Sequence, residues 1–311
     1  MRPKTGLIKI SCLIFLVLYL ILPATSNAFY GFTNEPGSHI DLTETAFKTV
    51  FQSLPGRAFS IGTVPIYSIH YYRWKPNRAV DFLADASRDT DIYYFGLAYP
   101  HAQTRSYPIR RAYSKGDLED IEIHAIFEYL NFMVETLEKT RLSYNAGDSR
   151  GALYRLGFYI HGYEDLFAHQ GITNEQHIWL EKKGQNPDTN QKSIGQCRTA
   201  MIQLAKNLSA ILGPSVGPEF QRQLTSTAEI RPTTTKERRR ILGRNPDIYW
   251  EGIKYKLTST NASCARYLDR IRWDYTTLAR LLNSREALEE ATRIQHPEAL
   301  RAFLKRYGYK F

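Results

Sequence analysis

The sequence is poor in cysteine, and this shortage limits its metal chemistry. The chain has 311 residues and only 3 cysteines. Cys12 lies in an apolar N-terminal segment, which leaves Cys197 and Cys264 as a candidate disulfide pair for an oxidising compartment. Two thiolates cannot by themselves complete a tetrahedral zinc site. Any metal site in this chain must therefore rest on histidine and carboxylate.

Motifs for covalent catalysis and patterns typical of strands are also scarce. No nucleophile elbow, no Ser-His-Asp order and no glycine-rich phosphate loop is evident. Strand-like alternation is weak, although 61–72 could be extended, whereas helical periodicity dominates the chain. No linker, composition shift or internal repeat divides the sequence. It therefore predicts a single all-helical domain over 29–311, with a metal-site part over 29–185 and a further helical part over 186–311.

Helices are predicted from apolar periodicity and from Gly, Pro and Asn breaks. The expected ranges are 39–54, 77–91, 117–144, a helix from about 150, then 193–212, 218–229, 247–257, 263–282 and 297–307. Residues 214–218 and 231–244 are expected to be surface excursions. The basic run from Lys236 to Arg240 is interpreted as a solvated face, with a phosphate-contacting patch as the alternative.

Residues 1–28 have the pattern of a cleavable signal peptide. Basic residues precede an apolar stretch over 10–23, and a small-residue site ends at Ala28. We therefore expect a mature chain that begins at Phe29 and is secreted or periplasmic, with an uncleaved anchor as the alternative. The formal net charge of +10 favours approach to anionic surfaces such as phospholipid headgroups or nucleic acid.

Histidines and carboxylates recur at four-residue intervals over 156–181. His161, Asp165 and His169 spread over about 80° of one helix face, and His177 and Glu181 share a face of the next helix. As surface pairs they would stabilise a helix by only roughly 0.2 to 0.5 kcal/mol. Apolar residues flank the first three, which favours burial, and buried ionisable groups need partners. The pattern therefore predicts a site for more than one metal ion.

Two further histidines have contexts that favour the same site. His39 stands at the predicted start of a helix, and His101 lies in a loop just after the acids Asp85, Asp89 and Asp91. Asp91 is preferred by its context as the acidic ligand of this segment. Asp89 and Asp85 remain open as alternatives.

The order of these motifs resembles a known family. Ser-His-x-x-Leu-Thr-x-x-Ala over 38–46 is followed by an Asp and a nearby His. Then come Ala-Leu-x-x-Leu-Gly-x-x-x-His-x-x-x-Asp-x-x-x-His over 152–169 and a closing His-x-x-x-Glu. The combination resembles the bacterial zinc-dependent phospholipase C family, which shares its helical fold with the fungal zinc nucleases specific for single strands. The resemblance covers roughly residues 29–185.

The resemblance implies up to three zinc ions in one cleft. One ion would be held by two acids and two histidines, namely Asp91, His101, His161 and Asp165. A second would be held by His169, His177 and Glu181. A third would be held by the amino group and carbonyl of Phe29 together with His39 and the shared Asp165.

The resemblance also implies an activity. A zinc-activated water would cleave the glycerol-phosphate ester of phospholipids, so the substrate is expected at a membrane or lipid surface. Asp91, or else Asp89 or Asp85, would orient the water or act as its general base, and Asp165 would be shared between ions. A zinc-dependent single-strand nuclease and a non-catalytic secreted zinc-binding protein are the alternatives. No obligate protein partner is evident.

Aromatic residues could form the rim of the cleft, where Tyr and Trp suit a boundary between polar and apolar surroundings. They could equally stack unpaired bases or belong to the core. The group comprises Tyr67, Tyr71, Tyr72, Trp74, Tyr93, Tyr94, Phe95 and Tyr99.

Overall fold

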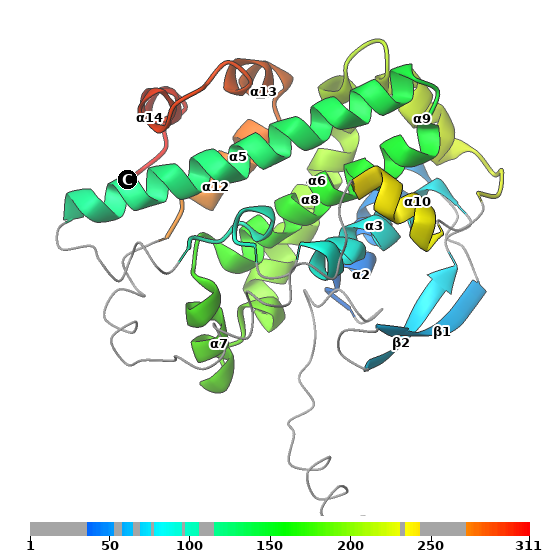
Figure 1. The fold of residues 1–311 in the computed structure, drawn as a ribbon, viewed down its shortest axis with the longest axis horizontal. Helices are drawn as coiled ribbons and strands as arrows, with labels where there is room; N and C mark the ends of the chain where they lie inside the picture. The colour runs from blue at the N-terminus through cyan, green and yellow to red at the C-terminus, as the bar shows by residue number, and fades with distance from the viewer. Residues whose placement is uncertain are drawn as a thin grey trace, which may run out of the picture.

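The computed structural model describes residues 36–52, 58–64, 69–75, 78–94, 97–105, 115–230, 234–242 and 272–311. The predicted signal peptide, Phe29, Cys264 and the helix expected over 247–257 lie outside these residues. Within the described part the chain is mostly helical, as the periodicity of the sequence predicted (Figure 1). None of the described helices combines the length and apolar character needed to cross a bilayer.

The described elements can be listed in chain order. In order they are α2 (His39–Phe51), β1 (Ala58–Val64), β2 (Ile69–Lys75), α3 (Ala79–Tyr93), η1 (Tyr99–His101), α5 (Lys115–Asn145), α6 (Ser149–His169), α7 (Asn174–Lys182), η2 (Pro187–Thr189), α8 (Gln191–Leu212), α9 (Gly217–Thr225), α10 (Thr235–Leu242), α12 (Tyr275–Leu282), α13 (Arg285–Ala291) and α14 (Pro297–Arg306). The strands β1 and β2 pair in an antiparallel manner. They overlap the stretch 61–72, which the sequence allowed to be extended, and each strand also reaches beyond it.

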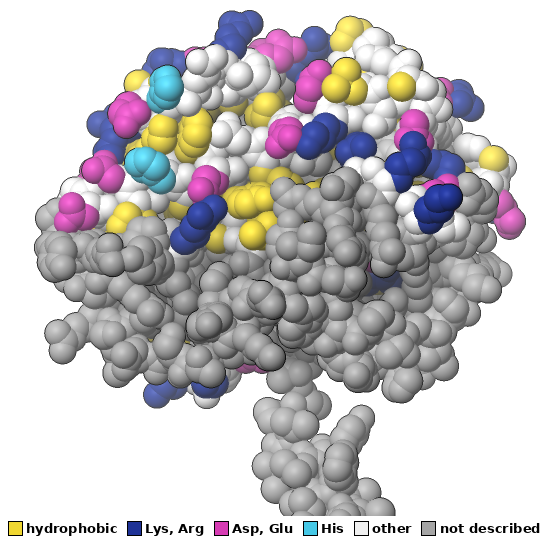
Figure 2. Space-filling model, viewed as in Figure 1, with side chains coloured by type: hydrophobic (Ala, Val, Ile, Leu, Met, Phe, Trp, Pro, Cys, Tyr) yellow, Lys and Arg dark blue, Asp and Glu magenta, His cyan; other side chains and the backbone are white. Residues whose placement is uncertain are grey.

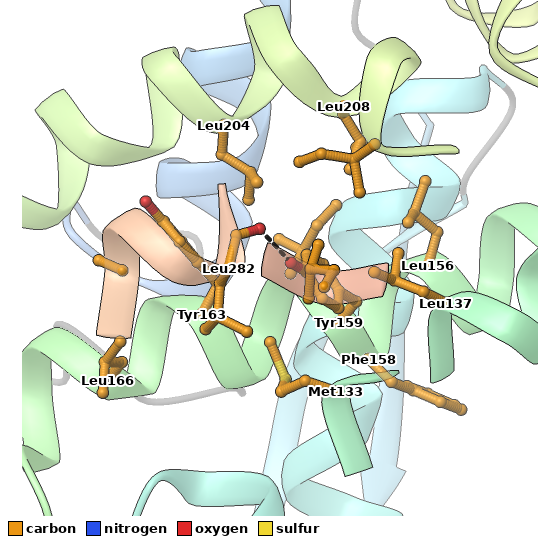
Figure 3. Close-up of a cluster of buried hydrophobic side chains, with 14 of the residues drawn as sticks. Met133, Leu137, Leu156, Phe158, Tyr159, Tyr163, Leu166, Leu204, Leu208 and Leu282 are labelled. Atoms are coloured by element: carbon orange, nitrogen blue, oxygen red, sulfur yellow. Dashed lines mark hydrogen bonds between the residues drawn. The ribbon is translucent and has the colours of Figure 1, made fainter. Parts of the chain in front are cut away.

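Helix α6 is the centre of the fold. Its side chains are buried almost continuously from Gly151 to His169, and α3, α5 and α8 pack around it. Figure 3 shows Leu204 and Leu208 of α8 pointing toward Tyr159 and Tyr163 of α6. The Tyr159 hydroxyl donates a hydrogen bond to a backbone carbonyl of α12, so this buried polar group is satisfied.

The basic run after residue 231 does not form the surface excursion predicted for it. It forms the helix α10, and Arg238 is only 5% exposed. Arg238 donates to Asp85 at 2.7 Å and lies 2.8 Å from Asp89, both on α3, and Arg88 pairs with the same two acids. The prediction of a solvated face was therefore wrong at Arg238, because two buried acids provide its counter-charge. Arg240, in contrast, is exposed.

Cys197 is a free thiol in the core rather than half of a disulfide. It is 0% exposed on α8, and its sulfur contacts the backbone carbonyl of Glu164 at 3.9 Å. Its burial among apolar side chains gives it the role of a small hydrophobic residue. Helix α13, for which no range was predicted, packs against α5 and α12, and Figure 1 shows it with α14 along one side of α5.

Candidate metal centre

Helix α6 places three of the predicted site residues on one buried face. His161, Asp165 and His169 follow one another at four-residue steps, and they are 0%, 1% and 7% exposed. The helix and the burial expected from the apolar neighbours are thus both present. Three ionisable side chains in the core of an apolar helix require partners from other elements.

The first partner comes from the start of α2. The hydroxyl of Ser38 caps this helix by accepting from the backbone N–H of Asp41, which fixes His39 as the first helical residue. The Nδ1 atom of His39 lies 2.7 Å from the carboxylate of Glu164, and both side chains are 0% exposed. This contact turns the Nε2 atom of His39 toward the α6 face.

Glu164 is held in turn by two hydroxyl groups. Thr43 of α2 donates to one of its oxygens at 2.8 Å, and Ser87 of α3 donates to the other at 2.7 Å. The carboxylate therefore links α2, α3 and α6 behind the site and orients the His39 ring. Sequence reasoning missed Glu164, although its place beside Asp165 in an apolar helix was a usable signal.

Two carboxylates lie between two imidazoles in the first group of ligands. The His39 Nε2 atom is 3.4 Å from Asp165 Oδ1 and 3.8 Å from Asp91 Oδ2. The His161 Nε2 atom is 2.9 Å from Asp165 Oδ2 and 3.7 Å from Asp91 Oδ1. Each aspartate thus turns one oxygen toward His39 and the other toward His161. This is an arrangement in which two carboxylates could bridge two cations.

His101 joins the His161 side of this group. Its Nδ1 atom is 2.9 Å from Asp165 Oδ2, 3.0 Å from His161 Nε2 and 3.8 Å from Asp91 Oδ1. Its Nε2 atom lies 3.3 Å from the carbonyl of Tyr94. The short helix η1 therefore brings His101 into contact with Asp165 and His161, two of the residues with which the sequence grouped it.

The acids of α3 separate into two roles. Asp91, near the end of the helix, lies in the ligand group, whereas Asp85 and Asp89 are neutralised by Arg88 and Arg238. Of the three alternatives left open by the sequence, the structure places only Asp91 beside His39, His161 and Asp165. Its side chain is 20% exposed, so it faces solvent more than its neighbours do.

A second group forms where α6, α7 and η2 meet. The Nε2 atoms of His169 and His177 lie 3.2 Å and 2.9 Å from the same oxygen, Asp188 Oδ1. The Nδ1 atom of His169 lies 2.6 Å from the carbonyl of His101, which sets the orientation of the ring. Thr173 caps α7 in a capping box with Gln176 and thereby positions His177.

Asp188 stands in this group where the sequence predicted Glu181. Glu181 is partly exposed and is not among the residues whose ligand atoms converge, although its charge helps to raise the pKa of His177. Asp188 is 6% exposed and lies in η2, whose start is fixed by the side chain of Asn186 accepting from the Asp188 backbone N–H. Asp188 is not part of a periodic pattern in the sequence, so residue spacing could not predict it as a ligand.

The ionisable groups perturb one another strongly. Burial raises the pKa of Asp91 to about 6, although the charges of His39 and His101 oppose the rise. Burial lowers the pKa of His161 to about 3, only partly offset by Asp165. For His39, burial lowers the pKa, but the nearby carboxylates of Asp165 and Asp91 and the hydrogen bond to Glu164 outweigh it, so the net shift is upward. Such opposed shifts are typical of functional sites.

Several buried side-chain atoms of the first group have no hydrogen-bond partner among the described residues. These buried atoms are Asp91 Oδ2, Asp165 Oδ1 and His161 Nδ1. For His39, Asp91, His161 and Asp165 in the first group, and for His169, His177 and Asp188 in the second, one ligand atom per residue lies within 4.8 Å of all the others in its set. Buried polar atoms without partners are costly, and a cation would satisfy the two carboxylate oxygens. Imidazole and carboxylate donors suit several divalent metals, zinc among them.

Comparison with known proteins leaves the family open. No protein-family model, no curated protein and no solved structure matches this chain. The residues described above, together with the order of motifs in the sequence, are therefore what supports a function.

Proposed function

We propose that this chain is a secreted zinc-dependent phosphoester hydrolase of the phospholipase C type, which cleaves the glycerol-phosphate ester of phospholipids. The observation that carries the proposal is the placement of Asp91 and Asp165 between His39 and His161, with one oxygen of each acid toward each imidazole. The resemblance of the sequence to the zinc-dependent phospholipases C supports the choice of metal and of reaction.

Both ligand groups would bind zinc. His39, Asp91, His101, His161 and Asp165 would hold ions in the first group, and the second group would hold one more. Zinc, when bound, supplies Lewis acidity toward phosphoester oxygens and makes water more acidic. Phe29 would add a ligand beside His39 if the chain is cleaved after Ala28.

Asp91 is suited to handle a proton. Its side chain is the most exposed of the carboxylates in the first group, at 20%, whereas that of Asp165 is 1% exposed. A general base must reach the proton that it takes, and Asp91 is the carboxylate here with access to solvent. Asp165, surrounded by imidazoles and held as an anion by a pKa well below its usual range, is a ligand rather than a base.

Single-strand nuclease activity is the second candidate, and one observation favours it. A cavity beside the site is lined by the aromatic residues Tyr94, Tyr99, Phe132 and Phe158 and by four basic side chains. Basic grooves with aromatic walls bind unpaired nucleic acid, because cations contact phosphates and rings stack on bases.

Metal analysis and two assays test the proposal. Purified full-length protein is analysed for metals by mass spectrometry, then tested for phosphocholine release from a lecithin emulsion and for degradation of single-stranded DNA, each with and without a chelator. Chelator-sensitive phosphocholine release supports the phospholipase, and DNA degradation alone assigns the nuclease. Neither activity in a protein that holds its full metal complement overturns the enzyme and leaves a secreted metal-binding protein.

A further inference from the structure

A cavity of about 560 Å³ lies beside the first ligand group, between α5, α6, η1 and α10. Four aromatic rings form its wall and pack on one another. The ring centroids of Tyr94 and Phe132 are 5.5 Å apart, those of Tyr94 and Phe158 are 5.6 Å apart, and those of Tyr99 and Phe132 are 5.6 Å apart. Such a wall is rigid and offers flat apolar surface to a ligand.

Positive charge dominates the rest of the lining. Four basic residues face two acids: Arg105, Lys139, Arg155 and Arg240 against Glu128 and Glu135. Both acids are already paired, Glu128 with Arg105 at 3.1 Å and Glu135 with Lys139 at 2.5 Å. Figure 2, in the same view as Figure 1, shows Lys and Arg side chains near visible hydrophobic side chains over this part of the molecule. Arg155 and Arg240 are therefore the two cations of the described lining that have no acid partner within it, since Asp148, which Arg240 approaches, lies outside the lining.

Arg155 has too little counter-charge for its position. It is partly buried, it donates from Nε to the hydroxyl of Ser143 at 3.1 Å, and it makes no ion pair with a described carboxylate. Burial lowers the pKa of its guanidinium, and the charge of Asp148 opposes this. Among the described residues no carboxylate pairs with the guanidinium of Arg155, and a guanidinium is suited to bidentate pairing with phosphate.

Arg240 adds an exposed positive charge from α10. Its side chain is 67% exposed and approaches Asp148 at 3.3 Å. An exposed pair of this kind contributes little stability, so Arg240 can turn toward an anion at small cost. Ile241 beside it closes the apolar side of the cavity.

The cavity and the ligand group share structural elements. Arg155 lies six residues before His161 on α6, which is about 9 Å along the helix axis. Tyr94 belongs to the cavity wall, and its carbonyl lies 3.3 Å from the Nε2 atom of His101. A ligand in the cavity would therefore be positioned with respect to the ligand group by the same residues.

We propose that this cavity is an anion-binding subsite that takes a second phosphate group of the substrate, with Arg155 and Arg240 on the phosphate and the aromatic wall against the group that carries it. The identification of the bound anion as part of a substrate rests on the proposed phosphoesterase function, whereas the binding of the anion itself needs no metal. It assigns to the enzyme a preference for substrates that carry a phosphate in addition to the ester that is cleaved.

Titration calorimetry with phenyl phosphate tests the subsite on the full-length protein. We expect Arg155→Gln to weaken binding by about tenfold or more, since a bidentate charged contact is lost, and Arg240→Gln to weaken it by a smaller factor. Arg285→Gln, at an exposed arginine of α13 that pairs with Glu289, is the matched control and should bind as the wild type does. Circular dichroism checks the fold of each variant, and the exposed position of Arg240 keeps the test valid should Arg155→Gln fail to fold.

A chelator separates this subsite from the metal groups. Binding of phenyl phosphate that survives the chelator and depends on Arg155 supports the subsite, even if the protein proves to hydrolyse no phosphoester. Binding that a chelator abolishes, or that is equal in wild type, Arg155→Gln and Arg240→Gln, overturns it, because the phosphate then lies elsewhere.

Competition identifies the natural source of the phosphate. Displacement of phenyl phosphate by inositol phosphate assigns a phosphorylated lipid headgroup, and displacement by thymidine monophosphate assigns a nucleotide. Either result supports the subsite. Failure of both competitors at concentrations well above that of phenyl phosphate contradicts a role in substrate recognition.

Discussion

A methyl group on Gly157 would lie 2.3 Å from the Cβ atom of Ala86, closer than any side chain can approach. The same methyl would meet backbone atoms of Leu83 and Ser87 at 2.8 and 2.9 Å. Glycine at this position of α6 therefore allows α3 to pack almost backbone to backbone against it. Asp91 lies one to two turns further along α3, and His161 lies one turn further along α6. The close approach is what brings these two side chains into one group.

Gly157→Ala should destabilise the protein by about 1 to 3 kcal/mol, because α3 and α6 must separate to admit the methyl group. Intrinsic helix propensity works in the opposite direction, since Ala exceeds Gly by about 1 kcal/mol. Gly195→Ala on α8 is the matched control, because nothing lies within 4 Å of the position of its methyl group. Urea denaturation should show a loss for the first variant and a gain for the second. Equal stability of the two variants would contradict the close-packing argument.

The regular parts of the structure were the predictable ones. The helical periodicity of α6, with His161, Asp165 and His169 on one face, depends only on local spacing, and the structure has both the helix and the shared face. His39 and His101 could be placed near that face from their local contexts, because a helix start and a loop after an acidic segment both suit a cleft. Features that depend on the local sequence could therefore be predicted from the sequence.

The unpredicted parts depend on contacts between distant segments. Asp188 reaches His169 and His177 only because η2 folds back against α6, and no local pattern encodes that return. Arg238 is buried because Asp85 and Asp89, about 150 residues earlier in the chain, lie opposite it. A basic run has the same composition whether its side chains face water or buried acids. Composition alone therefore predicted a solvent-exposed face.

The two ligand groups should lose metal independently. Asp165→Asn removes an oxygen acceptor from the centre of the first group, so metal content should fall there, whereas Asp188→Asn should empty only the second group. The sequence predicted Glu181 as the acidic ligand of the second group, whereas the structure places Asp188 there. Glu181→Gln is therefore the control, and it should retain the metal of both groups. Mass spectrometry of the purified variants gives the ion count. Loss of metal in Glu181→Gln, with full retention in Asp188→Asn, would assign Glu181 as the ligand instead.

Arg238→Ala should destabilise the protein by about 3 to 5 kcal/mol. It leaves Asp85 and Asp89 buried with one arginine between them, and an uncompensated buried charge is costly. It also removes the contact that attaches α10 to α3. Arg240→Ala, two residues further along the same helix, changes an exposed pair and should cost less than about 1 kcal/mol. Chemical denaturation of both variants measures the difference, and similar losses would show that the buried pairs contribute no more than the exposed one.

The stability of the protein should depend on pH through Glu122. This residue of α5 is 7% exposed and accepts a hydrogen bond from the hydroxyl of Tyr309 at 2.6 Å, near the C-terminus. Burial raises the pKa of Glu122 to about 7 from its ordinary value of 4.5, although the Tyr309 hydrogen bond opposes the rise. The folded state therefore holds a proton that the unfolded state releases between these two pH values, so the free energy of unfolding must fall as pH rises across that window.

The expected loss from Glu122 between pH 4.5 and pH 7 is on the order of 2 to 3 kcal/mol, since each pKa unit corresponds to about 1.4 kcal/mol. Glu122→Gln cannot ionise but can still accept the hydrogen bond from Tyr309, so its free energy of unfolding should fall less over the same window. Glu138→Gln, at an exposed site of the same helix, controls for the change to an amide. Urea denaturation at pH 4.5 and pH 7.5 measures both slopes. Parallel pH profiles for wild type and Glu122→Gln would mean that Glu122 ionises in the folded protein without cost, and that the contact between α5 and Tyr309 does not respond to pH.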